Sequence, residues 1–258
     1  EADPAPVMRF VLQGEKRFQI QSTSVNGKVS THVEGGIDQQ PKAGEDSRTA
    51  KVDLKALGEQ VNEVVDPAAV YDAIKTVGLW LGPSFQVAKQ VWRKKYEDGT
   101  CEIFAMLQLD ARVPNVGYIV HPALFDGTIH TLAAASIGKT EGGLMIFAGV
   151  GRVTVVQQEN FSQLEKYWIH LHVFEATETS ETFNLKIMSD DGVVLMLMDD
   201  VVFRSVRPEQ IQLAIAAQGT PEDEQKIYET EWSPLPDESL PEVQTAADQG
   251  LLVLAEDA

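Results

Sequence analysis

One segment constrains the fold of this chain more than any other: an apolar, helix-forming stretch at residues 122–135. Pro122 suits the first turn of a helix, and the alanines at 133–135 have the highest helix propensity of any residue. The segments on either side alternate apolar and polar residues, which is the period of strands. The sequence therefore predicts a helix starting near Pro122, with β-strands before and after it in the chain.

Strand-like segments make up much of the remaining chain. They are residues 7–12, 17–21, 28–33, 85–92, 101–109, 168–174, 183–187 and 193–206. The dipeptides Asn26-Gly27 and Asp191-Gly192 are two-residue hairpin signals. We therefore expect most of these strands to pair in antiparallel fashion.

A second helix is marked at both of its ends. Asp66 can cap the free N–H groups, Pro67 fits the first helical position, and Gly78 can close the helix in the left-handed conformation. Many antiparallel strands with one or two buried helices predict an α+β fold.

The composition excludes several classes of function. A formal net charge of −18 would repel nucleic-acid phosphates, so we expect no nucleic-acid partner. No apolar run reaches the roughly 18 residues of a membrane-spanning helix, so we expect a cytoplasmic chain with no membrane contact. Cys101, the single cysteine, forms no internal disulfide and no CxxC zinc pattern, so we expect no metal.

The charge is concentrated near the C-terminus. Residues 208–258 hold twelve acidic residues and one base, Lys226, together with several prolines. This composition is typical of a solvated linker.

Asp126 and His130 are the candidate pair for chemistry. They stand four residues apart in the predicted helix, so both side chains project from one face. A carboxyl group and an imidazole commonly move protons near neutral pH. The same residues also fit an aspartate placed favourably in the first helical turn with a partly buried histidine behind it, and residue types alone leave both interpretations open.

Two motifs make the interpretation specific. The pattern His-Pro-Ala-Leu-x-Asp-x-x-x-His occupies residues 121–130, and residues 78–85 read Gly-Leu-Trp-Leu-Gly-Pro-Ser-Phe. The first resembles a signature of polyketide synthase dehydratases, whose last position is usually Gln or His. The second resembles the Gly-Leu-x-Tyr-Gly-Pro-x-Phe turn of the same family. Residues 7–207 thus resemble the later part of a dehydratase domain of a modular (type I) polyketide synthase.

The resemblance implies a fold and a division into domains. The expected fold is a hotdog, a curved antiparallel sheet wrapped round a central helix, which the family duplicates as a double hotdog. Residues 1–48 would be the end of the first hotdog and a connecting loop, and residues 49–207 the second hotdog. Residues 208–258 would be the acidic linker and the start of a ketoreductase structural subdomain, because residues 227–235 resemble its opening strand.

The resemblance also implies an activity. The parent domain would be a hydro-lyase that removes water from a β-hydroxyacyl thioester on the phosphopantetheine of an acyl carrier protein, giving an α,β-unsaturated thioester. Asp126 would be the acid, and His130 would orient Asp126 or the hydroxyl. The expected substrate-binding residues are Leu81, Gly82, Pro83, Phe85, His121 and Pro122. No cofactor is implied beyond the carrier's arm, and the expected partners are the carrier protein and neighbouring domains such as the ketoreductase, in a parent that can be homodimeric.

Two departures from the family favour an alternative. The family's catalytic histidine belongs to a motif in the first hotdog. His32, Gly36 and Pro41 match that motif literally, but the polar residues that follow do not suit a buried helix. Leu81 replaces a common Tyr and removes a hydroxyl. The alternative is therefore a non-catalytic pseudo-dehydratase or a structural inter-domain fragment of the synthase.

Two further features have simpler explanations. His170 and His172 share one face of a predicted strand but have no third metal ligand, so they are expected to be polar residues of a half-exposed strand. The pattern Gly149-x-Gly151 lacks the strand-turn-helix setting of a phosphate-binding loop.

Overall fold

The computed structural model describes residues 7–14, 16–24, 27–38, 47–114, 118, 120–138, 144–156, 164–177 and 179–206. The described residues divide into two compact units, one within residues 7–35 and one within residues 36–206. The predicted acidic linker and ketoreductase start at 208–258 lie outside the described residues. The predicted boundary between residues 48 and 49 stays a prediction.

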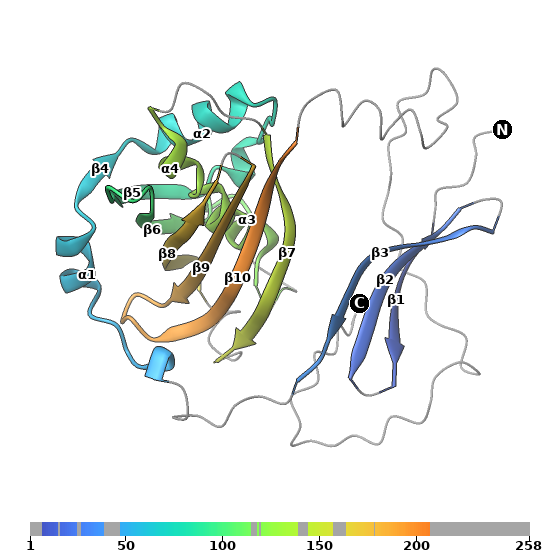
Figure 1. The fold of residues 1–258 in the computed structure, drawn as a ribbon. Coiled ribbons are helices and arrows are strands. Elements are labelled where there is room, and N and C mark those ends of the chain that lie inside the picture. Colours follow the sequence, from blue (N-terminus) through green and yellow to red (C-terminus); the bar gives the residue numbers. More distant parts are fainter. Residues whose placement is uncertain are drawn as a thin grey trace. The chain divides into compact units, whose positions relative to one another are not determined.

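The first unit contains a three-stranded sheet in the order β1-β2-β3 (Figure 1). Its strands are β1 (Val7–Gln13), β2 (Arg17–Thr23) and β3 (Val29–Gly36). β1 and β2 pair antiparallel, with Val7 opposite Thr23. Gly27 supplies the positive φ of 80° in the turn between β2 and β3. The strands predicted on either side of this turn are therefore confirmed.

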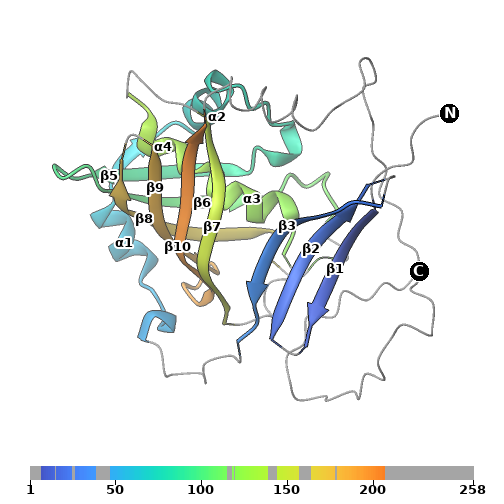
Figure 2. The ribbon, with the colours of Figure 1, turned by 45° about the vertical axis from the view of Figure 1, so that its right-hand side comes forward.

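The second unit contains a seven-stranded sheet in the order β4-β5-β6-β8-β9-β10-β7, in which neighbouring strands pair antiparallel. Its strands are β4 (Glu63–Val65), β5 (Ala88–Lys95), β6 (Cys101–Gln108), β7 (Leu144–Val155), β8 (Lys166–Ala176), β9 (Ser180–Met188) and β10 (Val194–Val206). The sheet curves around the helix α3 (Pro122–His130), which packs against β6 and β8 (Figures 1 and 2). The predicted α+β architecture with a central helix is confirmed.

The core lies between α3 and the concave face of the sheet. Alternate residues of β6, β8 and β9 are fully or almost fully buried there, as the predicted period of two requires. They are Ile103, Ala105, Leu107, Ile169, Leu171, Val173, Phe183, Leu185 and Ile187. Ala123 and Leu124 of α3 face them and are 1% and 0% exposed. Burial of each large aliphatic side chain stabilises the fold by about 1.5–3 kcal/mol.

The opposite face of the sheet is covered by a short helix that the sequence analysis did not predict. α1 (Leu54–Gln60) begins after Asp53, whose carboxylate accepts hydrogen bonds from the backbone N–H groups of Lys55 and Ala56. Leu57 of α1 packs into a second apolar cluster with the ring of Phe104. Phe104 in turn stacks with both Trp92 and Trp168.

The helix α2 (Pro67–Thr76) begins and ends as predicted. Asp66 accepts a hydrogen bond from the N–H of Ala68 at 2.9 Å. Gly78 follows with a φ of 91°, and its N–H donates to the carbonyl of Lys75 at 3.0 Å. A residue with a side chain would be strained at this φ, so Gly78 ends the helix.

The central helix is shorter than predicted. α3 ends at His130, and a separate turn of helix, α4 (Ala133–Ser136), follows. The Thr131 hydroxyl donates to the carbonyl of Thr128 at 2.7 Å. The N–H of Ala134 donates to the carbonyl of Thr131, three residues earlier in the chain. Such local bonds compete with the i to i−4 ladder of an α-helix, so residues 122–135 form two helices.

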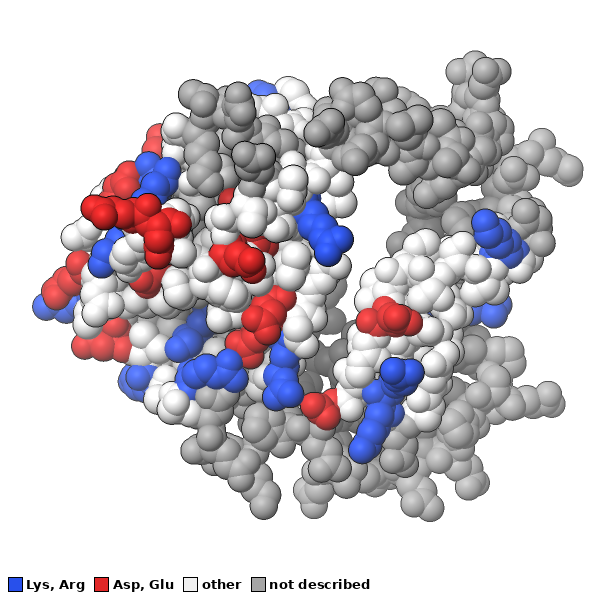
Figure 3. Space-filling model, viewed as in Figure 1, with Lys and Arg blue, Asp and Glu red and all other residues white. Residues whose placement is uncertain are grey.

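Charges of both signs share the surface of the second unit. Figure 3 shows acidic and basic side chains interspersed on the face drawn there. None of the helices in the described part of the chain has the length and apolar character that crossing a membrane requires.

Candidate functional site

The N-terminus of α3 is fixed by His121. Its Nδ1 accepts a hydrogen bond from the N–H of Ala123 at 3.1 Å, so the imidazole caps the helix. The side chain is buried, and burial lowers its pKa. Tyr118 packs edge-on against the ring, with centroids 5.2 Å apart. The structure thus gives His121 a local role in the helix, and the predicted substrate contacts of His121 and Pro122 stay predictions.

Asp126 and His130 lie together on α3, as their spacing predicted. Asp126 Oδ2 and His130 Nε2 are 3.1 Å apart. The two side chains differ in exposure, at 46% for Asp126 and 7% for His130. One oxygen of the Asp126 carboxyl group therefore contacts a buried imidazole. The rest of the group is accessible to a small molecule.

His130 has one ring nitrogen without a partner. Among the described residues, Nδ1 of His130 is buried and has no hydrogen-bond partner. A proton on Nδ1 would leave a buried donor unpaired, at a cost of about 1–3 kcal/mol. The geometry therefore favours the tautomer with its proton on Nε2, which donates to Oδ2 of the Asp126 carboxyl group.

The second motif packs directly against this helix. The 3₁₀ turn η2 (Pro83–Phe85) follows Gly82 and contacts α3. The carbonyl of Leu81 accepts a hydrogen bond from the side-chain amide of Gln86 at 3.0 Å, which fixes the turn. The structure thus brings the turn of residues 81–85 beside the helix that carries Asp126. Whether Leu81, Gly82, Pro83 and Phe85 contact a substrate stays a prediction.

Gly127 permits this close approach. A Cβ atom at Gly127 would lie 2.2 Å from Cγ2 of Val87, a buried residue just beyond η2. Any larger residue would push α3 away from the segment that follows the turn. The glycine next to Asp126 is therefore required by packing.

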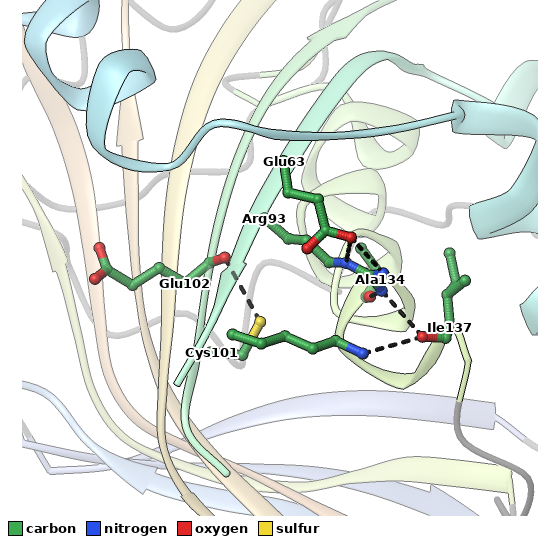
Figure 4. Close-up of polar contacts among 7 residues, drawn as sticks. Glu63, Arg93, Cys101, Glu102, Ala134 and Ile137 are labelled. Atoms are coloured by element: carbon green, nitrogen blue, oxygen red, sulfur yellow. Dashed lines mark hydrogen bonds and ion pairs between the residues drawn. The ribbon is translucent and has the colours of Figure 1, made fainter. Parts of the chain in front are cut away.

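The far end of the central segment is clamped by Arg93 (Figure 4). The guanidinium donates to the carbonyls of Ala134 and Ile137 at 2.7 and 3.0 Å, and to Glu63 at 2.7 and 2.9 Å. Lys95 donates to the same Ile137 carbonyl. Two cations thus donate hydrogen bonds to the carbonyls at the C-terminal end of α4. This end carries the negative pole of the helix dipole, which favours a positive charge. The hydrogen bond from Arg93 lowers the pKa of Glu63.

The histidines of β8 do not form a metal site. His170 Nε2 lies 2.7 Å from Glu102 Oε2, and Tyr96 donates its hydroxyl to the other oxygen of Glu102. Burial lowers the pKa of His170, and the bond to Glu102 raises the pKa of Tyr96 to about 12. Among the described residues, no group of three or more His, Cys, Asp or Glu could hold a metal ion. Gly149 and Gly151 lie inside β7, so they form no phosphate loop.

Two depressions of the surface lie elsewhere. One, of about 440 Å³, is lined by Arg48, Gly151, Arg152, Asn184, Asp199 and Asp200, and another, of about 560 Å³, lies beside residues 51–55. Neither contains a residue of the two motifs. Both are open to solvent, whereas the acid and imidazole that could transfer a proton are at Asp126 and His130, so we place the candidate site on α3.

The curved antiparallel sheet around a central helix defines a hotdog domain. Residues 49–212 match the family model described as the polyketide synthase dehydratase N-terminal domain. The chain therefore belongs to the polyketide synthase dehydratase family. The assignment of residues 49–207 to the second half of a double hotdog stays a prediction.

Individual proteins are also similar to this chain in sequence. The chain is 24% identical over 254 residues to the mycoketide-CoA synthase of Mycobacterium tuberculosis, covering 91% of this chain and 5% of that protein. It is 29% identical over 181 residues to polyketide synthase GfsE of Streptomyces halstedii, covering 67% of this chain and 4% of that protein. The chain thus spans a small part of the length of these relatives.

Solved structures share the fold. Two variants of the CurK dehydratase described as inactive mutants, one with histidine replaced by phenylalanine and one with aspartate replaced by asparagine, have TM-scores of 0.61 and 0.60. They are 22% and 21% identical, and the alignments cover 79% and 78% of this chain and 68% of each solved chain. This likeness establishes the hotdog fold.

Proposed function

We propose that this chain carries the acid of a β-hydroxyacyl-carrier-protein dehydratase within a polyketide synthase. The observation that carries the proposal is the Asp126 carboxyl group, partly exposed and held at 3.1 Å by the buried imidazole of His130. It lies on a central helix inside a sheet of the dehydratase fold. The CurK dehydratase variant with asparagine in place of aspartate is described as inactive, which is consistent with a requirement for an aspartate in that protein.

The proposed step removes water from a thioester. A base takes the α-proton, the electrons of that C–H bond form the α,β double bond, and the bond from the β-carbon to oxygen breaks. Protonated Asp126 gives its proton to the departing hydroxyl, which leaves as water. His130 orients the carboxyl group, so we assign it as a positioning residue.

Two histidines of the second unit are held by local hydrogen bonds that do not suit the role of base. His121 caps α3 through Nδ1, and His170 is bonded to Glu102. His32, in the first unit, is an exposed residue of β3 bonded to the hydroxyl of Ser22. We therefore assign the base to a histidine of the first hotdog of the parent synthase.

The substrate would arrive on the phosphopantetheine of an acyl carrier protein, and the dehydration needs no separate cofactor. The carrier and the neighbouring ketoreductase are the proposed partners. A homodimeric parent and a cytoplasmic location belong to the same proposal.

Substitution of Asp126 tests this function. In the parent synthase, we expect Asp126→Asn to reduce dehydration of a β-hydroxyacyl carrier-protein thioester by about 100-fold or more, because the proton donor is lost. Mass spectrometry of the carrier-bound acyl group reports the loss of one water. The matched control is Asp72→Asn, an exposed carboxylate on α2. Equal activity of Asp126→Asn and the control would refute the assignment.

A further inference from the structure

An exposed tryptophan with a lysine above it stands beside the candidate site. Trp80 is 73% exposed and the neighbouring Leu79 is 43% exposed. The ammonium of Lys75 lies 4.4 Å from the centroid of the Trp80 ring. A tryptophan this exposed leaves a large apolar surface in water, and such surfaces commonly mark binding sites.

The fold does not account for this exposure. Trp92 and Trp168 stack on the covered face of the sheet, where they contribute to packing. Leu81, next to Trp80, packs against the main core, so this segment directs Leu81 inward and leaves Trp80 outside. Trp80 is therefore available for a ligand.

Lys75 is available as well. It lies in the last turn of α2, where a cation is favoured by the helix dipole. Within the described residues, its partner is the Trp80 ring, and it forms no ion pair with a carboxylate. An ammonium without a carboxylate partner, placed over an aromatic ring, suits an anionic ligand.

The pair lies close to the helix that carries Asp126. Trp80 precedes Pro83 by three residues, so their Cα atoms are at most about 11 Å apart. Pro83 begins η2, and η2 contacts α3. The exposed pair thus flanks the turn beside the candidate site.

We propose that Lys75 and Trp80 bind the phosphopantetheine arm that carries the substrate. The ammonium would pair with the phosphate, and the indole would contact the dimethyl group next to it. This assignment rests on the proposed function, since it takes a carrier-bound thioester as the substrate. It adds a binding site for the non-reacting part of that substrate.

Binding to the 258-residue chain tests the site without any need for turnover. The probes are free phosphopantetheine, pantetheine without phosphate, and inorganic phosphate. The readout is the indole N–H signal of Trp80 in nuclear magnetic resonance, assigned by its loss in Trp80→Phe. We expect phosphopantetheine to shift this signal, pantetheine to bind about threefold more weakly, and inorganic phosphate alone to leave the indole signal unchanged.

Substitutions distinguish a specific binding site from nonspecific electrostatic attraction. We expect Lys75→Ala to weaken phosphopantetheine binding about threefold and Lys75→Arg to restore it. The matched control is Lys94→Ala, because Lys94 lies 5.1 Å from the ring of Tyr96 in a similar pair. It should leave binding unchanged. Circular dichroism confirms that these surface variants are folded.

Three outcomes would overturn the site. They are an unshifted Trp80 signal, an equal effect of Lys94→Ala and Lys75→Ala, and an equal response to inorganic phosphate, which would indicate an anion site only. The proposed function fails separately, through activity that survives Asp126→Asn. Binding at Trp80 in a chain whose parent performs no dehydration would support the site and refute the function.

Discussion

At the scale of single residues, Gly127 shows how packing and the site depend on each other. Its missing side chain lets α3 approach Val87, since a Cβ atom would lie 2.2 Å from Val87 Cγ2. We expect Gly127→Ala to lower the free energy of unfolding by about 1–3 kcal/mol, because the core must shift to admit a methyl group. Urea denaturation measures the change.

A compensating substitution makes this prediction specific. The double variant Gly127→Ala with Val87→Ala should lose less stability than the sum of the two single variants, because the second change removes the atom that clashes. Gly149→Ala is the control, since a Cβ there meets nothing within 4 Å. Additive losses in the double variant would contradict the role of Val87.

His130 makes a second prediction at this scale. A glutamine can still donate one hydrogen bond to Asp126, whereas a leucine cannot. In the parent, we expect His130→Leu to lower kcat about tenfold to 100-fold with little change in KM, and His130→Gln to stay within about tenfold of the parent. A purely structural role would instead lower the stability of both variants and affect their kcat alike, so unfolding is measured in parallel.

At the scale of elements, the sequence predicted what local patterns determine. The buried positions of β8 and β9 follow from the period of two, and α2 follows from Asp66 and Gly78. β7 was not predicted, because the strand is defined by its pairing with β10, which lies far away in the sequence. The Asp126–His130 pair was predictable from its spacing, but Arg93 was not, because Glu63 and Ala134 are brought to it only by the fold.

The Arg93 clamp makes the stability of the central helices depend on pH. The hydrogen bond from Arg93 holds the pKa of Glu63 below its ordinary value of 4.5. A carboxyl group with a lowered pKa in the folded state adds stability above its unfolded pKa, and this stability is lost as the pH falls through the folded pKa. The Glu63 side chain is half-exposed, so the effect is screened by solvent.

This dependence can be measured with one substitution. At pH 7, Glu63→Gln should unfold more easily than the unchanged chain. The difference should shrink as the pH falls below about 4.5 and vanish once Glu63 is protonated in the folded state. Glu59→Gln, at an exposed position of α1, serves as the control and should show no such trend. A difference that persists unchanged at low pH would mean that the clamp does not depend on the charge of Glu63.

At the scale of the whole molecule, family membership was predictable because two short motifs carry it. Residues 78–85 and 121–130 are separated in sequence, and the contact between η2 and α3 brings them together. The activity of the chain could not be deduced in the same way. Dehydration needs a base and an acid on either side of one carbon–carbon bond. Residue spacing shows only which side chains share a face of one helix or strand, so it cannot show a base contributed by another element.

The last prediction separates an enzyme from a scaffold. If the base belongs to the first hotdog of the parent, as proposed, the chain alone lacks a factor of roughly 10² to 10⁴ from proton transfer. We therefore expect the 258-residue chain alone to show little or no dehydration of a β-hydroxyacyl carrier-protein thioester, while the parent with an intact first hotdog is active. Mass spectrometry of the carrier-bound acyl group measures both. Rapid dehydration by the chain alone that disappears in His32→Ala would instead identify His32 as the base. An inactive parent that gains activity on Leu81→Tyr would show that the missing hydroxyl makes this domain a pseudo-dehydratase.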